Sequence, residues 1–279
     1  MSTAAGTDAK STPESIPKPL PAWPERQQLA YTIGTLVTDL ALYDTMRRSF
    51  IVGGFGEADC EYLAIDNTGP VQTSAYAGLN RVLAAACGRT VILCHQDVLL
   101  IDDDRAALDR RLDELEAHDP AWGVAGNAGG VIPGQLALRI TDPHRADWRI
   151  GEFPVKVKSL DENFMLVKKS AGLSFSHDLD GFHFYGTDIC LVAATLGASA
   201  YVIDFHLRHL SPGNSKTAAF AAAQAAVQRK WSSAFASRWV QTPNAPLVIS
   251  GSAWGRAWRR AAAPHLKKLN RWRRRWRRS

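Results

Sequence analysis

The chain has 279 residues, of which 46% are hydrophobic and 22% charged, and its formal net charge is +6. A chain of this size can bury one sizeable core, so we expect one globular domain with extensions. It contains no run of 18 apolar residues, which excludes a hydrophobic segment long enough to span a bilayer. Its four cysteines form no C-x-x-C pair, and this favours a reduced, cytoplasmic setting.

The charge is distributed unevenly along the chain. The last acidic residue is Asp204, and residues 1–204 carry 27 acidic against 17 basic side chains, a net charge of −10. Residues 205–279 carry 16 basic side chains and no acidic one. The positive net charge therefore belongs to the C-terminal part, whereas the part with catalytic-looking motifs is acidic.

Composition divides the chain into three regions. Residues 1–29 are rich in Ser, Thr, Pro and Lys, which predicts a flexible arm with polyproline-like stretches and not a signal peptide. Residues 30–240 carry the apolar patterns of a globular domain. Residues 241–279 are expected to form a linker and a basic, Trp- and Arg-rich helical tail.

The predicted elements alternate between strands and helices in the first half of the globular region. Residues 28–46 show helical spacing of apolar residues, with a strand near 33–37 as the alternative. The elements expected after them are a strand at 62–65, a helix at 76–86, a strand at 91–94, a helix at 105–117 and a strand at 122–126. This order predicts βαβ units and an α/β fold with a mostly parallel sheet flanked by helices.

The second half is less regular. Strands are predicted at 154–160, 163–167 and 201–205, and helices at 185–196 and 217–238. The three aspartates at 102–104 stand just before the predicted helix at 105–117. They therefore favour helix capping over a metal cluster.

Two predicted strands run into acidic residues. Asp66-Asn67 follows the strand at 62–65, where a carboxylate can bind a ribose or a base, or else form an Asx turn. Asp97 closes His95-Gln96-Asp97 after the strand at 90–94, where it is either a turn acid or a ligand that holds Mg²⁺ or Mn²⁺ against a diphosphate. No G-x-G-x-x-G or P-loop motif follows, which disfavours NAD-type and ATP-type sites.

Several motifs occur in a fixed order between residues 62 and 213, namely IDN, AGLN, ILCHQDV, VAGNAGG, LDENF, FHFYGTDIC and RHLSPG. This set resembles the glycosyltransferase family 2-like group. The resemblance implies a Rossmann-like fold of the GT-A type, a nucleotide-sugar donor, a glycan or lipid-linked acceptor, and Mn²⁺ or Mg²⁺ as the cofactor.

The resemblance also suggests roles for single residues. The residues implied in nucleotide-sugar binding are Asp66, Asn67, Asn80, Gln96 and Asp97. Those implied in metal binding are Asp97, His209 and His95, although His95 stands where many relatives have the first acid of a D-x-D motif. Asp188 matches the general base, and the residues implied on the acceptor side are Asp161, Glu162 and His183.

Each of these residues also has a structural alternative. For Asp188 the alternative is a place at a helix N-terminus, which it stabilises through the helix dipole. His209 precedes Ser-Pro-Gly and fits a turn, and His183 lies between two phenylalanines and fits an aromatic cluster. Asp161 and Glu162 fit the cap of a turn.

The resemblance thus implies an inverting, metal-assisted glycosyltransferase in which Asp188 deprotonates an acceptor hydroxyl in a single displacement. One alternative is a non-catalytic protein that binds sugar nucleotides or glycans on the same fold, since a fold does not fix a function. The other is a nucleic-acid-binding protein that uses its basic tail.

The tail at 254–279 repeats tryptophans at 254, 258, 272 and 276 with basic residues between them. This pattern predicts amphipathic segments that lie on an anionic membrane, at the inner face of the membrane of a cytoplasmic protein. A solvated tail ranks second, and a nucleic-acid partner ranks third.

Overall fold

The computed structural model describes residues 29–213, 217–241, 243 and 246–250. The predicted N-terminal arm, apart from residue 29, and the predicted basic tail at 254–279 lie outside the described residues. Both therefore remain predictions.

A seven-stranded sheet forms the centre of the fold. Its strands, in spatial order, are β2 (Cys60–Asp66), β1 (Leu29–Val37), β3 (Gly88–Cys94), β11 (Phe164–Lys168), β5 (Trp122–Gly126), β12 (Ser199–Val202) and β9 (Val155–Lys156). β1 is parallel to β2 and β3, and β12 is parallel to β5, whereas β11 and β9 run antiparallel to their neighbours. The predicted α/β class with a mostly parallel sheet is confirmed.

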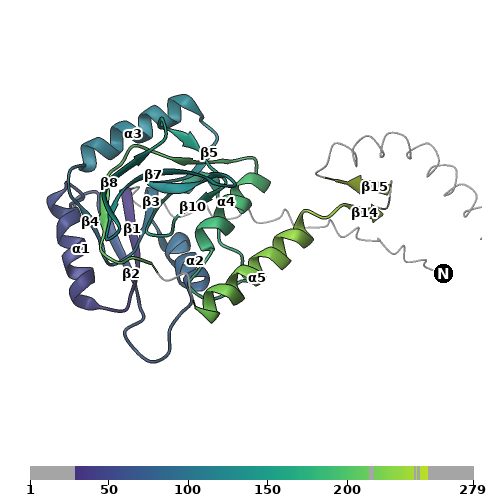
Figure 1. Cartoon of the computed structure of the whole chain (residues 1–279), viewed down its shortest axis with the longest axis horizontal. Coiled ribbons are helices and arrows are strands. Elements are labelled where there is room, and N and C mark those ends of the chain that lie inside the picture. The colour runs from purple at the N-terminus through teal and green to yellow at the C-terminus, as the bar shows by residue number, and fades with distance from the viewer. Residues whose placement is uncertain (1–28, 214–216, 242, 244–245, 251–279) are drawn as a thin grey trace, which may run out of the picture.

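Helices cover both faces of this sheet (Figure 1). They are α1 (Leu40–Val52), α2 (Ala75–Ala85), α3 (Arg105–His118), α4 (Tyr185–Thr195) and α5 (Ala218–Ala234), with a short 3₁₀ helix at Lys169–Ala171. Side chains alternate across β3, so Val91 and Leu93 pack with α2, α4 and α5, while Ile92 packs with α1 and α3. None of the described helices is long and apolar enough to cross a bilayer.

A second, six-stranded sheet lies against the first. Its strands are β10 (Ser159–Leu160), β6 (Ala128–Ile132), β7 (Gln135–Asp142), β13 (Leu207–His209) and β4 (Val98–Leu100), with β8 (Arg145–Ile150) paired to β7. A separate two-stranded sheet, β14 (Arg238–Gln241) with β15 (Pro246–Ile249), follows α5. The sequence did not predict β4, β7, β8 or this last hairpin.

The structure differs from the predicted element order in three places. Residues 28–46 do not form one helix, because Leu29–Val37 is the central strand β1 and Asp39 then caps α1 by accepting hydrogen bonds from the Ala41 and Leu42 amides. The glycine-rich segment after β5 enters β6, and the sequence predicted neither this strand nor β13. The predicted strand at 154–160 is two short strands, β9 and β10, which join different sheets.

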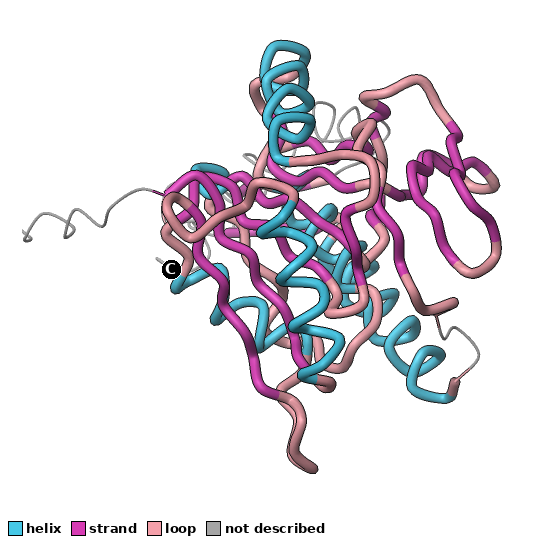
Figure 2. The backbone as a smooth tube through the Cα atoms, turned by 90° about the vertical axis from the view of Figure 1, so that its left-hand side faces the viewer, coloured by secondary structure: helices cyan, strands magenta, loops and turns pink. Residues whose placement is uncertain are grey.

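The strands β1, β2 and β3 end at the same edge of the main sheet, since they are parallel. The connection at 67–74, between β2 and α2, projects from this edge in Figure 1 and again in Figure 2, the view from the side of α1. The carboxyl ends of the strands therefore define the edge where an α/β sheet binds ligands.

The start of α3 offers a test of the predicted capping. The Asp104 side chain accepts a hydrogen bond of 2.8 Å from the Ala107 amide. We expect Asp104→Ala to lower the free energy of unfolding by about 1 kcal/mol, as loss of an N-cap does. Urea unfolding measures this change, with the exposed Asp113→Ala in the same helix as a control. Equal effects of the two variants would contradict a capping role for Asp104.

Candidate functional site

The pairing of β4 with β13 brings two distant segments together beyond the end of β3. Val98 lies opposite His209, and the Leu210 amide donates a hydrogen bond of 3.0 Å to the Asp97 carbonyl. His95 Nδ1 lies 3.3 Å from His209 Nε2, and His209 Nε2 lies 3.3 Å from Asp97 Oδ1. His95 Nδ1 is 4.0 Å from Asp97 Oδ1. The structure thus brings together the three residues predicted to bind a metal.

The electrostatics of this cluster favour the forms that bind cations. Burial acts to raise the pKa of Asp97, but hydrogen bonds from His209 and Ser211 and the charges of the histidines outweigh it and lower the pKa to about 2. Burial, together with the neighbouring His209, lowers the pKa of His95. A charged carboxylate and a neutral imidazole are the protonation states in which these groups ligate metals.

The spacing of the three groups fits a single ion. Ligand atoms that lie about 2.1 Å from a common metal are roughly 3.0–3.4 Å apart, and the three atoms here lie within 4.8 Å of one another. The Tyr185 hydroxyl lies 2.9 Å from His95 Nε2, which leaves Nδ1 toward the other two groups. Such a partner orients a ligating imidazole. The cluster is therefore able to hold a metal ion.

A cavity of about 270 Å³ lies beside the cluster. It is lined by Leu36, Thr38, Asn67, Leu79, Leu93, Cys94, His95, Gln96, Asp97, Glu162, Phe182 and Tyr185. Gln96 is held in place because its Oε1 accepts hydrogen bonds from the Thr38 and Asp39 amides, at 2.8 and 2.9 Å. The wall that contains Gln96 is therefore polar and fixed, whereas Leu36, Leu79 and Phe182 form an apolar wall.

Glu162 is the acidic residue with the most perturbed titration in this cavity. Withdrawal from water raises the pKa of its carboxyl to about 8, with a further contribution from Asp161, while hydrogen bonds from backbone amides at the start of α4 oppose the shift. Among these bonds is one of 3.2 Å from the Gly186 amide. A carboxyl group with a pKa near the working pH is suited to proton transfer.

A strained turn places α4 against Glu162. Phe184, just before α4, has φ of 65°, a left-handed conformation that costs a non-glycine residue about 1–2 kcal/mol. At Gly186 an added Cβ would lie 2.4 Å from the Leu160 carbonyl oxygen, so only glycine fits there. Tyr185 between them reaches both His95 and the cavity, a role that the sequence did not predict although FHFYG marks the helix start.

Two residues predicted to bind the nucleotide do not line the cavity. Asp66 is exposed and accepts hydrogen bonds from the Thr68 amide and hydroxyl, which is the Asx turn expected as its alternative. Asn80 bonds the Phe175 amide and carbonyl and braces that loop. Asn67, Gln96 and Asp97 do line the cavity.

Asp188, predicted as the general base, is fully buried and also lies outside the cavity lining. It occupies the first turn of α4, and its carboxylate accepts three hydrogen bonds. The donors are the Ser176 amide and hydroxyl, each at 2.8 Å, and Trp231 Nε1 of α5 at 2.9 Å. In this arrangement the carboxylate joins α5 to the core.

The remaining acceptor-side residues take structural positions. The His183 ring packs against Phe220 with 5.2 Å between ring centroids, which agrees with the alternative that His183 belongs to an aromatic cluster. Asp161 is exposed and accepts a hydrogen bond from the Asn163 amide at 2.9 Å. Of the three predicted residues, Glu162 alone lines the cavity.

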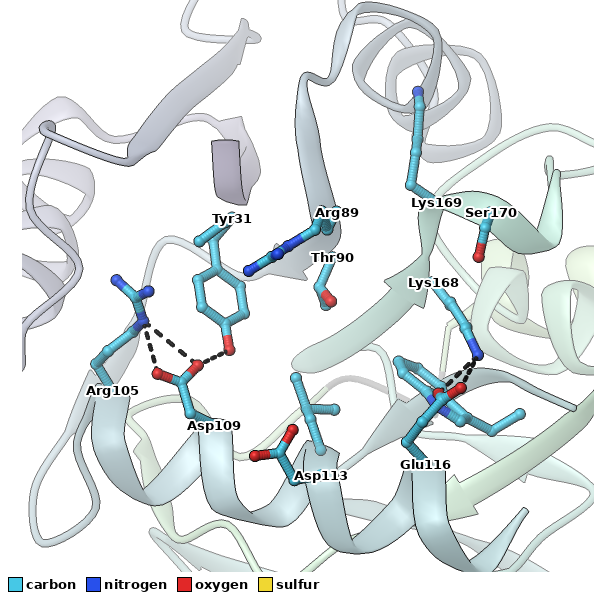
Figure 3. A pocket seen from close by; sticks show the side chains of 13 residues that line it. Tyr31, Arg89, Thr90, Arg105, Asp109, Asp113, Glu116, Lys168, Lys169 and Ser170 are labelled. Carbon is cyan, nitrogen blue, oxygen red and sulfur yellow. Dashed lines mark hydrogen bonds and ion pairs between the residues drawn. The ribbon is translucent and has the colours of Figure 1, made fainter. Parts of the chain in front are cut away.

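A larger cavity of about 810 Å³ opens at the opposite edge of the sheet, near the starts of β1 and β3 (Figure 3). Within it, Asp109 binds Tyr31 and Arg105, and Glu116 binds Lys168. It shares no lining residue with the smaller cavity. We therefore place the candidate site at the smaller cavity.

Comparisons with known proteins establish a family. The "ATP synthase subunits region ORF 6" protein of Fuscovulum blasticum is 39% identical over 202 residues, which cover 69% of this chain and 81% of that protein. The chain belongs to the same family as this protein. No protein-family model matches the chain.

Two solved structures are similar at a low level. A197 from STIV has a TM-score of 0.39 and 15% identity, over 65% of this chain and 85% of that one. GalNAc-T7 with UDP, GalNAc and Mn²⁺ has a TM-score of 0.46 and 7% identity, over 67% of this chain and 45% of that one. Likenesses at this level carry no argument about function, which rests on the geometry of the site.

The pKa of Glu162 predicts how stability depends on pH. Below about pH 4.5 the carboxyl is protonated in both the folded and unfolded states. Between about pH 4.5 and pH 8 the folded state keeps a proton that the unfolded chain loses, so the free energy of unfolding falls as the pH rises through this window. Glu162→Gln stays neutral, so we expect it to become more stable relative to the wild type from pH 5 to pH 8. Thermal unfolding of both proteins measures this difference, with the exposed Glu152→Gln as the control. A constant difference across this range would contradict the raised pKa.

Proposed function

We propose that this protein transfers a sugar from a nucleoside diphosphate donor to an acceptor hydroxyl, with inversion at the anomeric carbon. The observation that carries this proposal is that the cluster of His95, Asp97 and His209 lies beside a cavity lined by Glu162, whose carboxyl group has a pKa of about 8. Diphosphate leaving groups need a cation, and acceptor hydroxyls need a base. The cavity thus has residues beside it that could hold a cation and a residue that could act as the base.

The donor end of the site is the cluster. Asp97, His95 and His209 would hold the ion, and two imidazoles with one carboxylate suit Mn²⁺ better than Mg²⁺, which prefers an all-oxygen set. A bound cation would neutralise the negative charge that develops on the diphosphate. The apolar wall of Leu36, Leu79 and Phe182 suits the nucleoside.

The acceptor end is Glu162. As a carboxylate, it takes the proton of the acceptor hydroxyl while that oxygen forms a bond to the anomeric carbon. The bond from the anomeric carbon to the phosphate oxygen breaks in the same displacement, and the nucleoside diphosphate leaves with the electron pair. One base and one displacement give inversion without a covalent intermediate.

This assignment replaces Asp188 as the base. A general base must come within hydrogen-bond reach of the proton that it removes. The Asp188 carboxylate is buried and accepts three hydrogen bonds from Ser176 and Trp231. We therefore propose that Asp188 is a positioning residue, which fixes α5 against the core.

A non-catalytic protein that binds sugar nucleotides is the second candidate. The observation that favours it is the position of Asp188, since the residue that the family resemblance implies as the base is held away from the cavity. Turnover that depends on Glu162 separates the two candidates. A nucleic-acid-binding protein has no support from the described residues.

The acceptor, the membrane contact and the compartment rest on the sequence. We propose a glycan or lipid-linked acceptor, and a membrane contact through residues 254–279 at the inner face of the membrane. The 11 basic residues of this segment, without any acidic one, are the support for an anionic surface.

We expect nucleotide binding to depend on the cluster. Calorimetry with UDP, and with dTDP and GDP, should show binding that needs Mn²⁺. Asp97→Ala and His209→Ala should each weaken metal-dependent binding at least tenfold, and Tyr185→Phe about tenfold to a hundredfold, since it removes the partner of His95. The exposed His177→Ala is the control. Unchanged metal-dependent affinity in Asp97→Ala would contradict the assignment.

We expect Glu162→Gln to lower the rate of transfer or donor hydrolysis by about two to four orders of magnitude, with nucleotide affinity retained and without loss of stability. Asp188→Asn and Trp231→Phe disturb the same hydrogen bond from opposite sides. A positioning role for Asp188 predicts that both lower stability and activity together. If Trp231→Phe leaves the rate intact while Asp188→Asn abolishes it, Asp188 is the base and the assignment of Glu162 is wrong.

A further inference from the structure

One face of the β14–β15 hairpin is apolar and exposed. Val240 lies opposite Leu247, and Arg238 lies opposite Ile249. Residues directly opposite in an antiparallel pair share a face, so these four side chains lie on one side of the hairpin. The exposed fractions of Val240, Leu247 and Ile249 are 38%, 46% and 54%.

This hairpin forms a sheet of its own, because its two strands pair with each other and with no other described strand. In Figure 1 it lies apart from the two larger sheets, at the far end of α5. An isolated two-stranded hairpin is marginally stable in water. An exposed apolar face on such a hairpin therefore indicates a surface that another phase or molecule covers.

Charge identifies the kind of surface that covers it. The chain has no acidic residue after Asp204, and Arg238, whose position is on this face, supplies a cation there while its guanidinium donates a hydrogen bond of 2.6 Å to the Ser233 carbonyl. A surface with apolar side chains and cations but no anions suits an anionic bilayer. There the lipid phosphates attract the cations, and the apolar side chains are buried at the boundary between headgroups and acyl chains. A second copy of the chain would bring a second Arg238 to the same face, and the like charges would repel.

The hairpin is connected to the catalytic domain through anchored groups. Phe235 stacks on Trp231 with 5.3 Å between ring centroids, and Trp231 Nε1 binds the buried Asp188. Lys230 of α5 also pairs with Asp178. Arg238 of the hairpin donates a hydrogen bond of 2.6 Å to the Ser233 carbonyl in α5, so the hairpin is tied to the helix that Asp188 anchors.

We propose that Val240, Leu247 and Ile249 insert into the interface of an anionic lipid bilayer, with Arg238 at the phosphate level. This inference extends the membrane contact proposed above for residues 254–279, and it rests on the proposed function, in which the acceptor is held at a membrane. It depends, however, on different residues, which can be tested by themselves.

An environment-sensitive fluorophore at the hairpin tests insertion in the full chain. Cys87→Ala removes the one cysteine that is not buried, and Leu247→Cys then carries the fluorophore. Leu196→Cys, at an apolar position that is 62% exposed just after α4, is the matched control. Vesicles of phosphatidylcholine with phosphatidylglycerol should shift the emission at 247 to the blue and leave the emission at 196 unchanged. Vesicles of phosphatidylcholine alone should have no effect.

Co-sedimentation with the same anionic vesicles gives the second measurement. The triple variant Val240→Ser, Leu247→Ser, Ile249→Ser should have a vesicle partition coefficient lower than that of the wild type by a factor of roughly ten or more. Leu196→Ser should behave as the wild type. Vesicle binding without a shift at 247 overturns the proposal, and so does a complete lack of vesicle binding. A shift that grows with protein concentration in the absence of lipid, or one produced by RNA, also overturns it. UDP binding with Mn²⁺, measured on the same samples, reports on the proposed function separately.

Discussion

The candidate site depends on one backbone interaction, the antiparallel pairing of β4 with β13. His95 and His209 are 114 residues apart in the chain, yet this pairing sets their ring nitrogens 3.3 Å from each other. The hydrogen bond from the Leu210 amide to the Asp97 carbonyl continues the pairing into the cluster. Because strand pairing and not the rotamers of mobile loops fixes these positions, little ordering is needed when a cation binds.

The second constraint acts at Glu162, on the proposed acceptor side, and it is also a property of the backbone. Phe184 in the left-handed region turns the chain so that α4 begins against β10, and Gly186 permits that approach because no Cβ fits there. The same turn brings Tyr185 to His95 and the Gly186 amide to Glu162. The His-Asp-His cluster and Glu162, the proposed donor and acceptor ends of the cavity, are thus joined through three consecutive residues. This explains how a carboxyl with a raised pKa and a cluster that favours cations coexist in one small cavity.

Much of this arrangement could be predicted from the sequence, because it follows from local pattern. Asp97 after an apolar strand and Asp104 before an amphipathic helix have local signatures, and both lie where those signatures place them. What could not be predicted depends on contacts between distant segments. Trp231 binds Asp188 across 43 residues, and this burial by α5 separates Asp188 from the cavity. The raised pKa of Glu162 likewise arises mainly from burial by distant segments, and its neighbour Asp161 contributes less. The short strands β4 and β8 lack a clean alternation of buried and exposed residues, so their pattern was not informative.

The central claim is that His95, Asp97 and His209 hold one cation that also contacts the diphosphate of the donor. Pulsed electron paramagnetic resonance of the protein with Mn²⁺ and UDP tests this claim most directly, because it detects the nuclei bonded to the ion. The account predicts coupling to two imidazole nitrogens and to phosphorus in the same complex, with the nitrogen coupling reduced when His209 is replaced by Ala. Phosphorus coupling without nitrogen coupling, or the spectrum of the fully hydrated ion, would contradict it.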